Sequence, residues 1–363
     1  MSQQDPPPTD ATGPTAGRVS TNVDEVLGKA GIPSPRPRGS ARPKRKGFST
    51  ADVVSDYGVV LFLLALIVFF SIVIPSRFPT WENTQTILGD QAIPGLLALA
   101  VVLPLAAGEF DLSIAATLGF NAVLAAYLTA HGVAVPLAFI ICIACGCAIG
   151  ALNALLVVGI GLNAFIATLG TATVLAGGNL FVTNGATIFE GIPKSLTKIS
   201  QTEFLELPLV VFYFVVIAIG LWYLMEHTPF GRYLRATGAG REAARLTGVP
   251  TGRYLALAFI IAGALAALCG VLQTARTGSA TASVGPEFLL PAYAAAFLGA
   301  TTIKRGRFNV WGTVVGVFVL AVGITGLQLW GAPFWVPNVF NGTALILAVS
   351  VAVLVGRRRG DTV

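Results

Sequence analysis

Residues Thr237–Pro250 read TGAGREAARLTGVP, a polar stretch between two long apolar runs. Most residues of Arg241–Leu246 are strong helix formers, and Glu242 and Arg245 lie about one turn apart, where opposite charges attract. A Gly-x-Pro sequence then supplies a helix stop. The pattern predicts a short helix, about residues 238–248, on a membrane surface. Because a helix of about two turns is not stable alone, the parent domain or a partner must hold it.

The role of this short helix stays open between two interpretations. Ala243 and Leu246 stand between charged residues, so one face of the helix can dock into a groove while the charged face stays in water. The alternative is an ordinary cytosolic loop whose basic residues only set the orientation of the chain in the membrane. The rest of the sequence decides between them.

The composition is that of a membrane protein. Of the 363 residues 55% are hydrophobic and only 11% are charged, with a mean hydropathy of +0.78. An ordinary soluble domain has about a quarter of its residues charged, so that class is excluded. The net charge of +6 does not indicate nucleic acid, because the basic residues are confined to tails and a few loops without interleaved aromatic residues. Membrane lipid is the expected surrounding.

Ten apolar stretches are long enough to be membrane-spanning helices, which need about 20 largely apolar residues. We therefore predict an all-α polytopic membrane protein. Gly and polar residues around Gly108–Ser113 and Gly159–Asn163 predict broken or re-entrant helices there. The ten stretches are 57–75, 84–106, 113–130, 135–158, 164–182, 208–226, 254–275, 287–303, 309–327 and 338–356.

An even number of spans places both termini on one side of the membrane. Of the 23 Lys and Arg residues, 19 then lie on the side of the termini. The positive-inside rule therefore predicts that both termini are cytosolic. The four on the other side are Arg77, Lys194, Lys198 and Arg276. The outer loop, about Asn184–Leu207, is expected either to cap the bundle or to meet an external partner.

The domain organisation follows from composition. Residues 1–50 carry eight prolines and eight basic residues with scarcely any aromatic residue, which predicts a disordered cytosolic tail that can touch anionic lipid headgroups. Residues 51–357 form the predicted transmembrane domain, which the resemblance given below makes a permease domain, and residues 358–363 form the cytosolic end. The four cysteines all stand in apolar segments without His or acidic neighbours, so neither a metal site nor a disulfide is indicated.

Two acids, Glu109 and Asp111, stand between the second and third spans, close to the predicted cytosolic face. Carboxylates near a bilayer usually face protein or water, which makes both candidates for a functional site. Asp111 can instead cap the helix that follows it. Neutral polar residues within the apolar stretches are further candidates, although each can also bond helix to helix. The best of them are Asn121, Asn153, Asn163, Thr168, Thr171 and Asn179.

Glycines within the apolar stretches are expected to allow close helix packing rather than to touch cargo. They are Gly170, Gly177, Gly178, Gly263, Gly270, Gly312 and Gly316. The sequence shows no catalytic constellation, no metal-ligand spacing and no G-x-x-x-x-G-K-[ST] phosphate loop. Energy for transport must therefore come from outside this chain.

Four segments in order resemble the permease family of bacterial ATP-binding-cassette (ABC) importers for ribose, xylose and related simple sugars. They are GEFDLS at Gly108–Ser113, NAFIATLGT at Asn163–Thr171, Thr228–Gly248 with TPFGR and GREAARLTG, and Leu298–Thr313 with LGAT and GT. Together they reach across about Asp52–Arg357. The sequence departs from the family pattern at Glu109, where a second glycine is common.

The resemblance implies a subunit of the bacterial inner membrane without its own ATPase. Two permease copies, forming a homodimer, would pair with two ABC ATPase subunits that use ATP and Mg, and a periplasmic or lipid-anchored sugar-binding protein would deliver the cargo. This chain itself would bind no cofactor. Alternatives within reach are an ion-coupled secondary transporter, and an ABC permease for nucleosides or branched-chain amino acids.

The resemblance also assigns roles to residues. Residues 240–248, here called the coupling segment, match the helix that rests on the ATPase; the residues concerned are Gly240, Arg241, Glu242, Ala243, Ala244, Arg245, Leu246 and Gly248. The expected pathway or gate residues are Glu109, Asp111, Asn121, Asn153, Asn163, Phe165, Thr168 and Thr171.

Overall fold

The computed structural model describes residues 50–304 and 306–358. One compact unit extends over Ser49–Val363. The predicted disordered tail lies outside the described residues except for Thr50, and only Arg358 of the predicted cytosolic end is described. Of the predicted permease domain, residues 51–304 and 306–357 are described.

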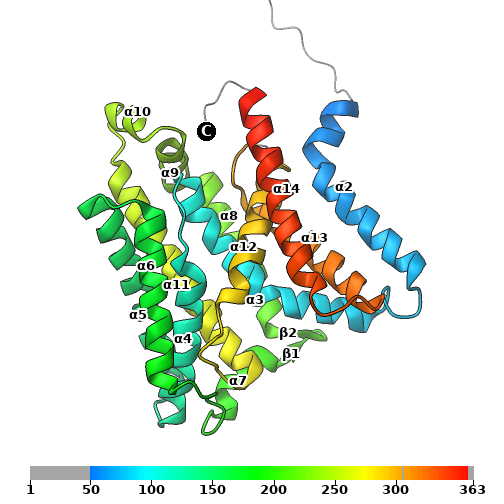
Figure 1. The fold of residues 1–363 in the computed structure, drawn as a ribbon, viewed down its shortest axis with the longest axis vertical. Coiled ribbons are helices and arrows are strands. Elements are labelled where there is room, and N and C mark those ends of the chain that lie inside the picture. Colours follow the sequence, from blue (N-terminus) through cyan, green and yellow to red (C-terminus); the bar gives the residue numbers. More distant parts are fainter. Residues whose placement is uncertain (1–49, 305, 359–363) are drawn as a thin grey trace, which may run out of the picture. The chain divides into compact units, whose positions relative to one another are not determined.

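The chain is built almost entirely of helices (Figure 1). The first half contains α2 (Thr50–Val73), α3 (Trp81–Ala106), α4 (Ser113–Ala130), α5 (Val135–Ala154), the π-helix η1 (Leu155–Ile160) and α6 (Ala164–Thr183). The second half contains α7 (Lys194–Gln201), β1 (Glu203–Phe204), β2 (Leu207–Pro208), α8 (Leu209–His227), α9 (Pro229–Ala239), α10 (Arg241–Leu246), α11 (Thr251–Thr277), α12 (Pro286–Ala300), α13 (Val310–Leu329) and α14 (Val336–Arg358). Within the described residues the antiparallel pair of two-residue strands, together with an isolated β-bridge, departs from the all-α prediction.

All ten predicted apolar stretches are helical, but they are not equally long. Within the described residues seven helices are long and apolar enough to cross a membrane: α3, α4, α5 with η1, α6, α8, α11 and α13. Shorter apolar helices occupy Tyr57–Val73 and Val336–Val351, and α12 has 15 residues. The polytopic helical prediction is confirmed, and length with composition supports seven of its ten spans.

Both predicted helix interruptions are present. Residues 107–112, here called the α3–α4 connector, leave the helical path, and Gly108 adopts a φ of +83°. The second break follows η1, where Gly161 has a φ of +85°. A glycine takes this left-handed conformation without the steric penalty of a side chain. Within the connector Ala107 and Asp111 are buried, whereas Gly108 and Phe110 are exposed.

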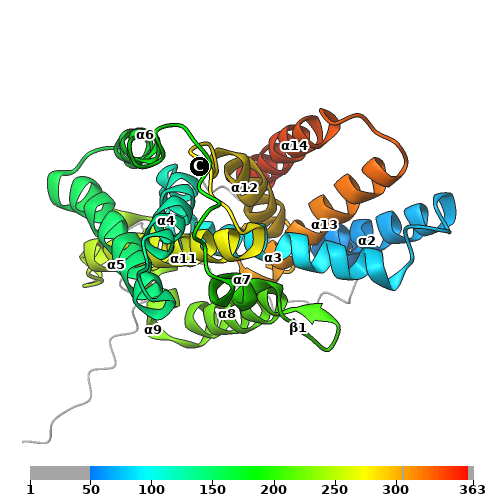
Figure 2. The ribbon, with the colours of Figure 1, turned by 90° about the horizontal axis from the view of Figure 1, so that it is seen from below.

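The centre of the bundle is formed by α3 and α11, with α8 on one side and α4 and α12 on the other (Figure 2). Side chains such as Leu97 and Phe259 are fully buried there. Glycines bring backbones together: a Cβ on Gly263 would lie 2.3 Å from the carbonyl oxygen of Gly146 in α5. The same close packing occurs at Gly270 and Gly312.

The packing prediction holds for Gly263, Gly270, Gly312 and Gly316, each of which faces another backbone at short range. It is wrong for Gly170 and Gly177, which have open space where a Cβ would lie. Both are on the exposed face of α6. Gly170 and Gly177 stand in an apolar stretch as the other four glycines do. The difference in their surroundings therefore comes from how α6 packs, which the sequence pattern does not show.

The loop between α6 and α8 folds back on the bundle at the end opposite α9 and α10 (Figure 1). The Trp81 indole donates to the Glu206 carboxylate at 2.7 Å, and the Gln201 amide donates to the carbonyl of Arg276 at 2.8 Å. A single β-bridge joins Ile188 to Ala280. These contacts support the cap interpretation of the loop.

Candidate functional site

The polar stretch Thr237–Pro250 forms the tip of a helical arm, the name used here for α9 and α10. Pro229 starts α9, the chain bends at Gly240, and α10 ends before Gly248, whose φ is +86°. The prediction of one helix over about 238–248 is therefore corrected: the short helix covers Arg241–Leu246 only. The residues just before Gly240 belong to α9, a helix that the sequence did not predict, because its 11 residues are too polar and too few for a span.

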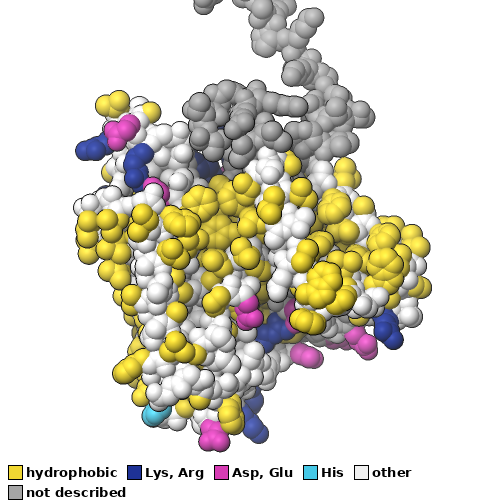
Figure 3. Space-filling view, in the orientation of Figure 1, with side chains coloured by type: hydrophobic (Ala, Val, Ile, Leu, Met, Phe, Trp, Pro, Cys, Tyr) yellow, Lys and Arg dark blue, Asp and Glu magenta, His cyan; other side chains and the backbone are white. Residues whose placement is uncertain are grey.

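The tip of this arm presents side chains outward rather than toward the bundle. The Leu246 side chain is 88% exposed, and Glu242, Ala243 and Arg245 are also exposed. Only Ala244 is buried and holds α10 to its own domain. Figure 3 shows charged and apolar side chains gathered at this tip. The tip therefore leaves one large apolar side chain, Leu246, uncovered by the rest of the chain.

The arm is tied to the α3–α4 connector. The Arg241 guanidinium donates to the Glu109 carboxylate at 3.0 Å, across 132 residues of sequence. Beside this ion pair the backbones touch, since a Cβ on Gly238 would lie 2.3 Å from the carbonyl oxygen of Ala106. Arg241, which was predicted to belong to the coupling segment, therefore contacts Glu109, which was predicted to belong to the pathway or gate.

A second tie fixes the other side of the arm. The Glu226 carboxylate at the end of α8 pairs with Arg235 of α9 at 3.4 Å and with Lys304 at 2.5 Å. Lys304 stands in the turn between α12 and α13. The side chain of Glu226 is only 16% exposed, so its two cationic partners compensate a largely desolvated charge.

The buried end of the connector carries a polar network. Asp111 is 2% exposed, and one of its carboxylate oxygens accepts hydrogen bonds from the Ser113 amide at 3.0 Å and the Ser113 hydroxyl at 2.6 Å. The Asn153 amide donates to the Ser113 hydroxyl at 2.7 Å, and the Thr171 hydroxyl donates to the Asn153 carbonyl oxygen at 2.8 Å. The helix-start bonds of Asp111 match the capping alternative. Its burial shows that the Asp111 carboxylate faces protein rather than water.

Two further side chains hold the connector backbone itself. The Tyr293 hydroxyl accepts from the Asp111 amide and donates to the Asp111 carbonyl, both at 3.0 Å. The Thr168 hydroxyl accepts from the Leu112 amide at 3.0 Å. Phe110 stacks on the Tyr293 ring with a centroid distance of 6.0 Å. The connector is thus held by α4, α6 and α12 within a few residues.

Of the predicted pathway residues, the structure brings Asp111, Asn153, Thr168 and Thr171 together, and Glu109 lies two residues away from Asp111. Sequence analysis missed Ser113 and Tyr293. The signal that could have found Tyr293 is a single hydroxyl-bearing aromatic residue inside an otherwise apolar span, since a buried Tyr hydroxyl needs a partner.

The remaining predicted residues lie outside this network. Asn163 caps α6 by accepting from the Phe165 amide at 2.9 Å, and the Phe165 ring is 52% exposed. Asn121 is fully buried in α4 and donates to the carbonyl of Thr117. Asn179 donates a long 3.5 Å bond to the carbonyl of Ala282.

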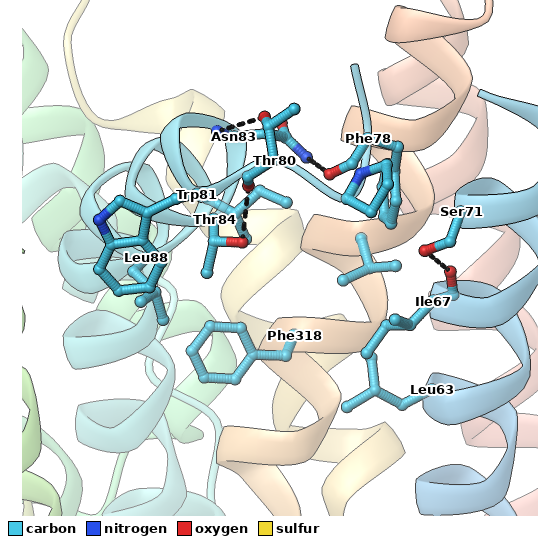
Figure 4. A pocket seen from close by; sticks show the side chains of 13 residues that line it. Leu63, Ile67, Ser71, Phe78, Thr80, Trp81, Asn83, Thr84, Leu88 and Phe318 are labelled. Atoms are coloured by element: carbon cyan, nitrogen blue, oxygen red, sulfur yellow. Dashed lines mark hydrogen bonds between the residues drawn. The ribbon is translucent and has the colours of Figure 1, made fainter. Parts of the chain in front are cut away.

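A cavity of about 540 Å³ lies elsewhere in the bundle, between α2, the start of α3 and α13 (Figure 4). Its walls are mostly apolar, with Leu63, Trp81 and Phe318 among them. None of the predicted pathway residues lines it. Within residues 50–304 and 306–358, no group of three His, Cys, Asp or Glu side chains is placed to hold a metal ion.

Comparison with known proteins finds a permease family model and relatives that are import permeases. The family model described as "Branched-chain amino acid transport system / permease component" matches residues 83–354. The ribose import permease protein of Bacillus subtilis is 33% identical over 298 residues, which cover 82% of this chain and 92% of the relative.

Two further relatives have similar coverage. The ribose import permease protein of Escherichia coli K12 is 29% identical over 310 residues, 85% of this chain and 96% of the relative. The autoinducer 2 import system permease protein of Salmonella typhimurium is 29% identical over 301 residues, 81% of this chain and 91% of the relative. No solved structure matches the chain.

Proposed function

Because this chain belongs to the family of branched-chain amino acid transport system permease components, we propose that it is the membrane subunit of an ABC importer for a monosaccharide or related polyol. The names of its relatives support a sugar-like cargo, because two import ribose and one imports autoinducer 2. The protein is a multi-pass protein of the bacterial inner membrane.

The observation that carries this proposal is the exposed tip of α10. A subunit without a phosphate-binding loop needs an external motor, and the coupling segment is the surface that meets it. Ala244 anchors the segment to the domain while Leu246 is left uncovered. The ATPase subunits would bind ATP and Mg, and their closure would push the arm and rock the bundle between outward and inward access.

The arrangement of charges supports ten spans with both termini in the cytosol. The basic residues of the arm and Lys304 gather at one end of the bundle, tied together through Glu109 and Glu226. The four basic residues assigned to the outside belong to the opposite end: two are in α7, Arg276 ends α11 near it, and Arg77 precedes α3. The positive-inside rule assigns the end with α9 and α10 to the cytosol.

The buried network supports a gate rather than an open sugar-binding surface in this conformation. Asp111, Asn153, Thr168 and Thr171 bond to one another or to the connector, so their donors and acceptors are occupied by protein. A polar cargo would have to exchange with these bonds when the connector moves. Asn121, Asn163 and Phe165 remain proposed pathway residues on other faces of α4 and α6.

The proposed assembly contains two copies of this chain, two ATPase subunits and a periplasmic or lipid-anchored sugar-binding protein. The decisive experiment reconstitutes the chain in proteoliposomes with the co-purified ATPase and binding protein, and measures uptake of labelled D-ribose and of other pentoses with and without Mg-ATP. We expect uptake that requires ATP and all three components. Uptake by this chain alone, abolished by an ionophore and indifferent to ATP, would establish a secondary transporter instead.

A matched pair of variants tests the coupling segment in the same vesicles. Glu242→Ala is expected to let the ATPase hydrolyse ATP while uptake falls, since Glu242 is exposed on α10. Glu203→Ala, an equally exposed acid in β1 at the opposite end, is expected to leave the ATPase rate unchanged. Normal uptake by Glu242→Ala would remove that residue from the coupling role.

A further inference from the structure

Resting on the proposed function, we infer that Glu109 is a positioning residue: it holds Arg241 of the coupling segment and passes movements of that segment to the α3–α4 connector. The proposal deepens the coupling role, because it names how a push on α10 reaches the buried network. It depends on two contacts of the connector, one at each of its ends.

The first contact lies at the arm. The Arg241–Glu109 ion pair of 3.0 Å is accompanied by backbone packing, since a Cβ on Gly108 would lie 3.4 Å from the Cα of Gly238. Gly238 in turn sits directly on the carbonyl oxygen of Ala106. Gly238 belongs to α9, whereas Arg241 is the first residue of α10. The ion pair therefore links the connector directly to the coupling segment.

The second contact lies two residues further on. The Asp111 amide and carbonyl are both bonded to the Tyr293 hydroxyl, and the Leu112 amide to the Thr168 hydroxyl. Asp111 also holds Ser113, the first residue of α4. A displacement of Glu109 therefore strains bonds that reach α4, α6 and α12 at once.

The arm is tied to the bundle at a second point and contains no long loop. Glu226 holds Arg235 of α9 and Lys304 of the turn between α12 and α13. Only Gly240 separates α9 from α10. A push on the exposed tip therefore moves α9 with it, and reaches the connector through the Arg241–Glu109 pair rather than being absorbed in a loose loop.

The exposure of the pair argues against a role in stability alone. The Arg241 side chain is 41% exposed and that of Glu109 is 25% exposed. Pairs with this much solvent contact contribute little to the free energy of folding. A change at Glu109 should therefore alter transmission without unfolding the protein, which separates a positioning role from a merely structural one.

The test uses the full chain with its ATPase in lipid nanodiscs and measures backbone hydrogen exchange with and without Mg-ATP and vanadate. In the natural protein we expect exchange to change in both residues 241–248 and residues 107–112. In Glu109→Gln we expect the change in 241–248 to persist and the change in 107–112 to be lost. The double variant Glu109→Arg with Arg241→Glu, which reverses the pair, should restore the response of 107–112.

Glu82→Gln is the matched control: the same change on an exposed acid at the far end of α3, expected to leave both responses intact. A full response of 107–112 in Glu109→Gln would overturn the inference, as would a reversed pair that fails to restore it. If neither segment of the natural protein responds, the ATPase-coupling proposal itself fails. A response confined to 241–248 leaves that proposal standing and refutes only the role of Glu109.

Discussion

The Asn153 amide donates a hydrogen bond to the Ser113 hydroxyl at 2.7 Å, so a side chain of α5 holds the first residue of α4. The other end of the same amide accepts from Thr171 of α6. Three helices therefore meet through one buried side chain. In a low-dielectric interior such a network is stable only while every member is paired. When one partner is lost, a buried polar group is left without its hydrogen bond, and this lowers the free energy of unfolding.

Thr171→Val keeps the shape of the side chain and removes the hydroxyl that donates to Asn153 at 2.8 Å. We expect a loss of about 1–3 kcal/mol, because the Asn153 carbonyl oxygen is left buried without that donor. Thermal unfolding in detergent measures it. Thr173→Val, on the exposed face of the same helix, is the control and should change stability by well under half of that amount. Equal losses in the two variants would contradict a special role of the network.

Tyr293→Phe tests the bond pair that holds the connector backbone. The ring and its stacking on Phe110 remain, while both hydrogen bonds to Asp111 are lost. We expect a loss of about 1–3 kcal/mol in stability and faster hydrogen exchange at the Asp111 amide. Tyr223→Phe, with a ring that is 59% exposed, serves as the control. Unchanged exchange at Asp111 would show that the hydroxyl is dispensable there.

Gly263→Ala tests backbone packing between α5 and α11. The added methyl group would lie 2.3 Å from the carbonyl oxygen of Gly146, so the helices must separate. We expect a loss of about 1–3 kcal/mol or more and a lower yield of folded protein. Gly177→Ala is the control: it meets open space on α6, and alanine favours a helix by about 1 kcal/mol over glycine. Folded yield after size-exclusion chromatography distinguishes the two.

Leu246→Asp tests the exposed tip of α10. The side chain is 88% exposed, so the substitution should leave thermal stability unchanged while it weakens association with the ATPase, measured by co-purification from membranes. Leu205→Asp places the same change on a leucine that is 73% exposed between β1 and β2. The control should keep its ATPase. Retention of the ATPase by Leu246→Asp would exclude Leu246 from the interface.

The sequence was informative wherever one physical property repeats along a helix. A run of about 20 apolar residues can satisfy its backbone in lipid only as a helix, which is why all ten stretches were located. The breaks at Gly108 and Gly161 were visible for the same reason, since glycine and polar residues interrupt that run. The arm was harder to predict from the sequence, because α9 has neither the length of a membrane span nor the composition of an ordinary loop.

The candidate site was predicted residue by residue but not as a site. Asp111, Asn153, Thr168 and Thr171 were singled out because polar side chains in an apolar span need partners, a property of each residue alone. Which partner each one takes depends on helix packing. Ser113 gave no sign of its part, and the only sign of Tyr293 was a lone hydroxyl-bearing ring in an apolar span.

By itself the sequence determined that the protein is a helical membrane permease, because hydropathy, charge placement and motif order act locally along the chain. Only the tertiary structure decided that Glu109 meets Arg241 and that Tyr293 holds Asp111, contacts that span 132 and 182 residues. Such contacts depend on how close the helices approach, and that distance is set by glycines facing backbones rather than by any pattern within one segment.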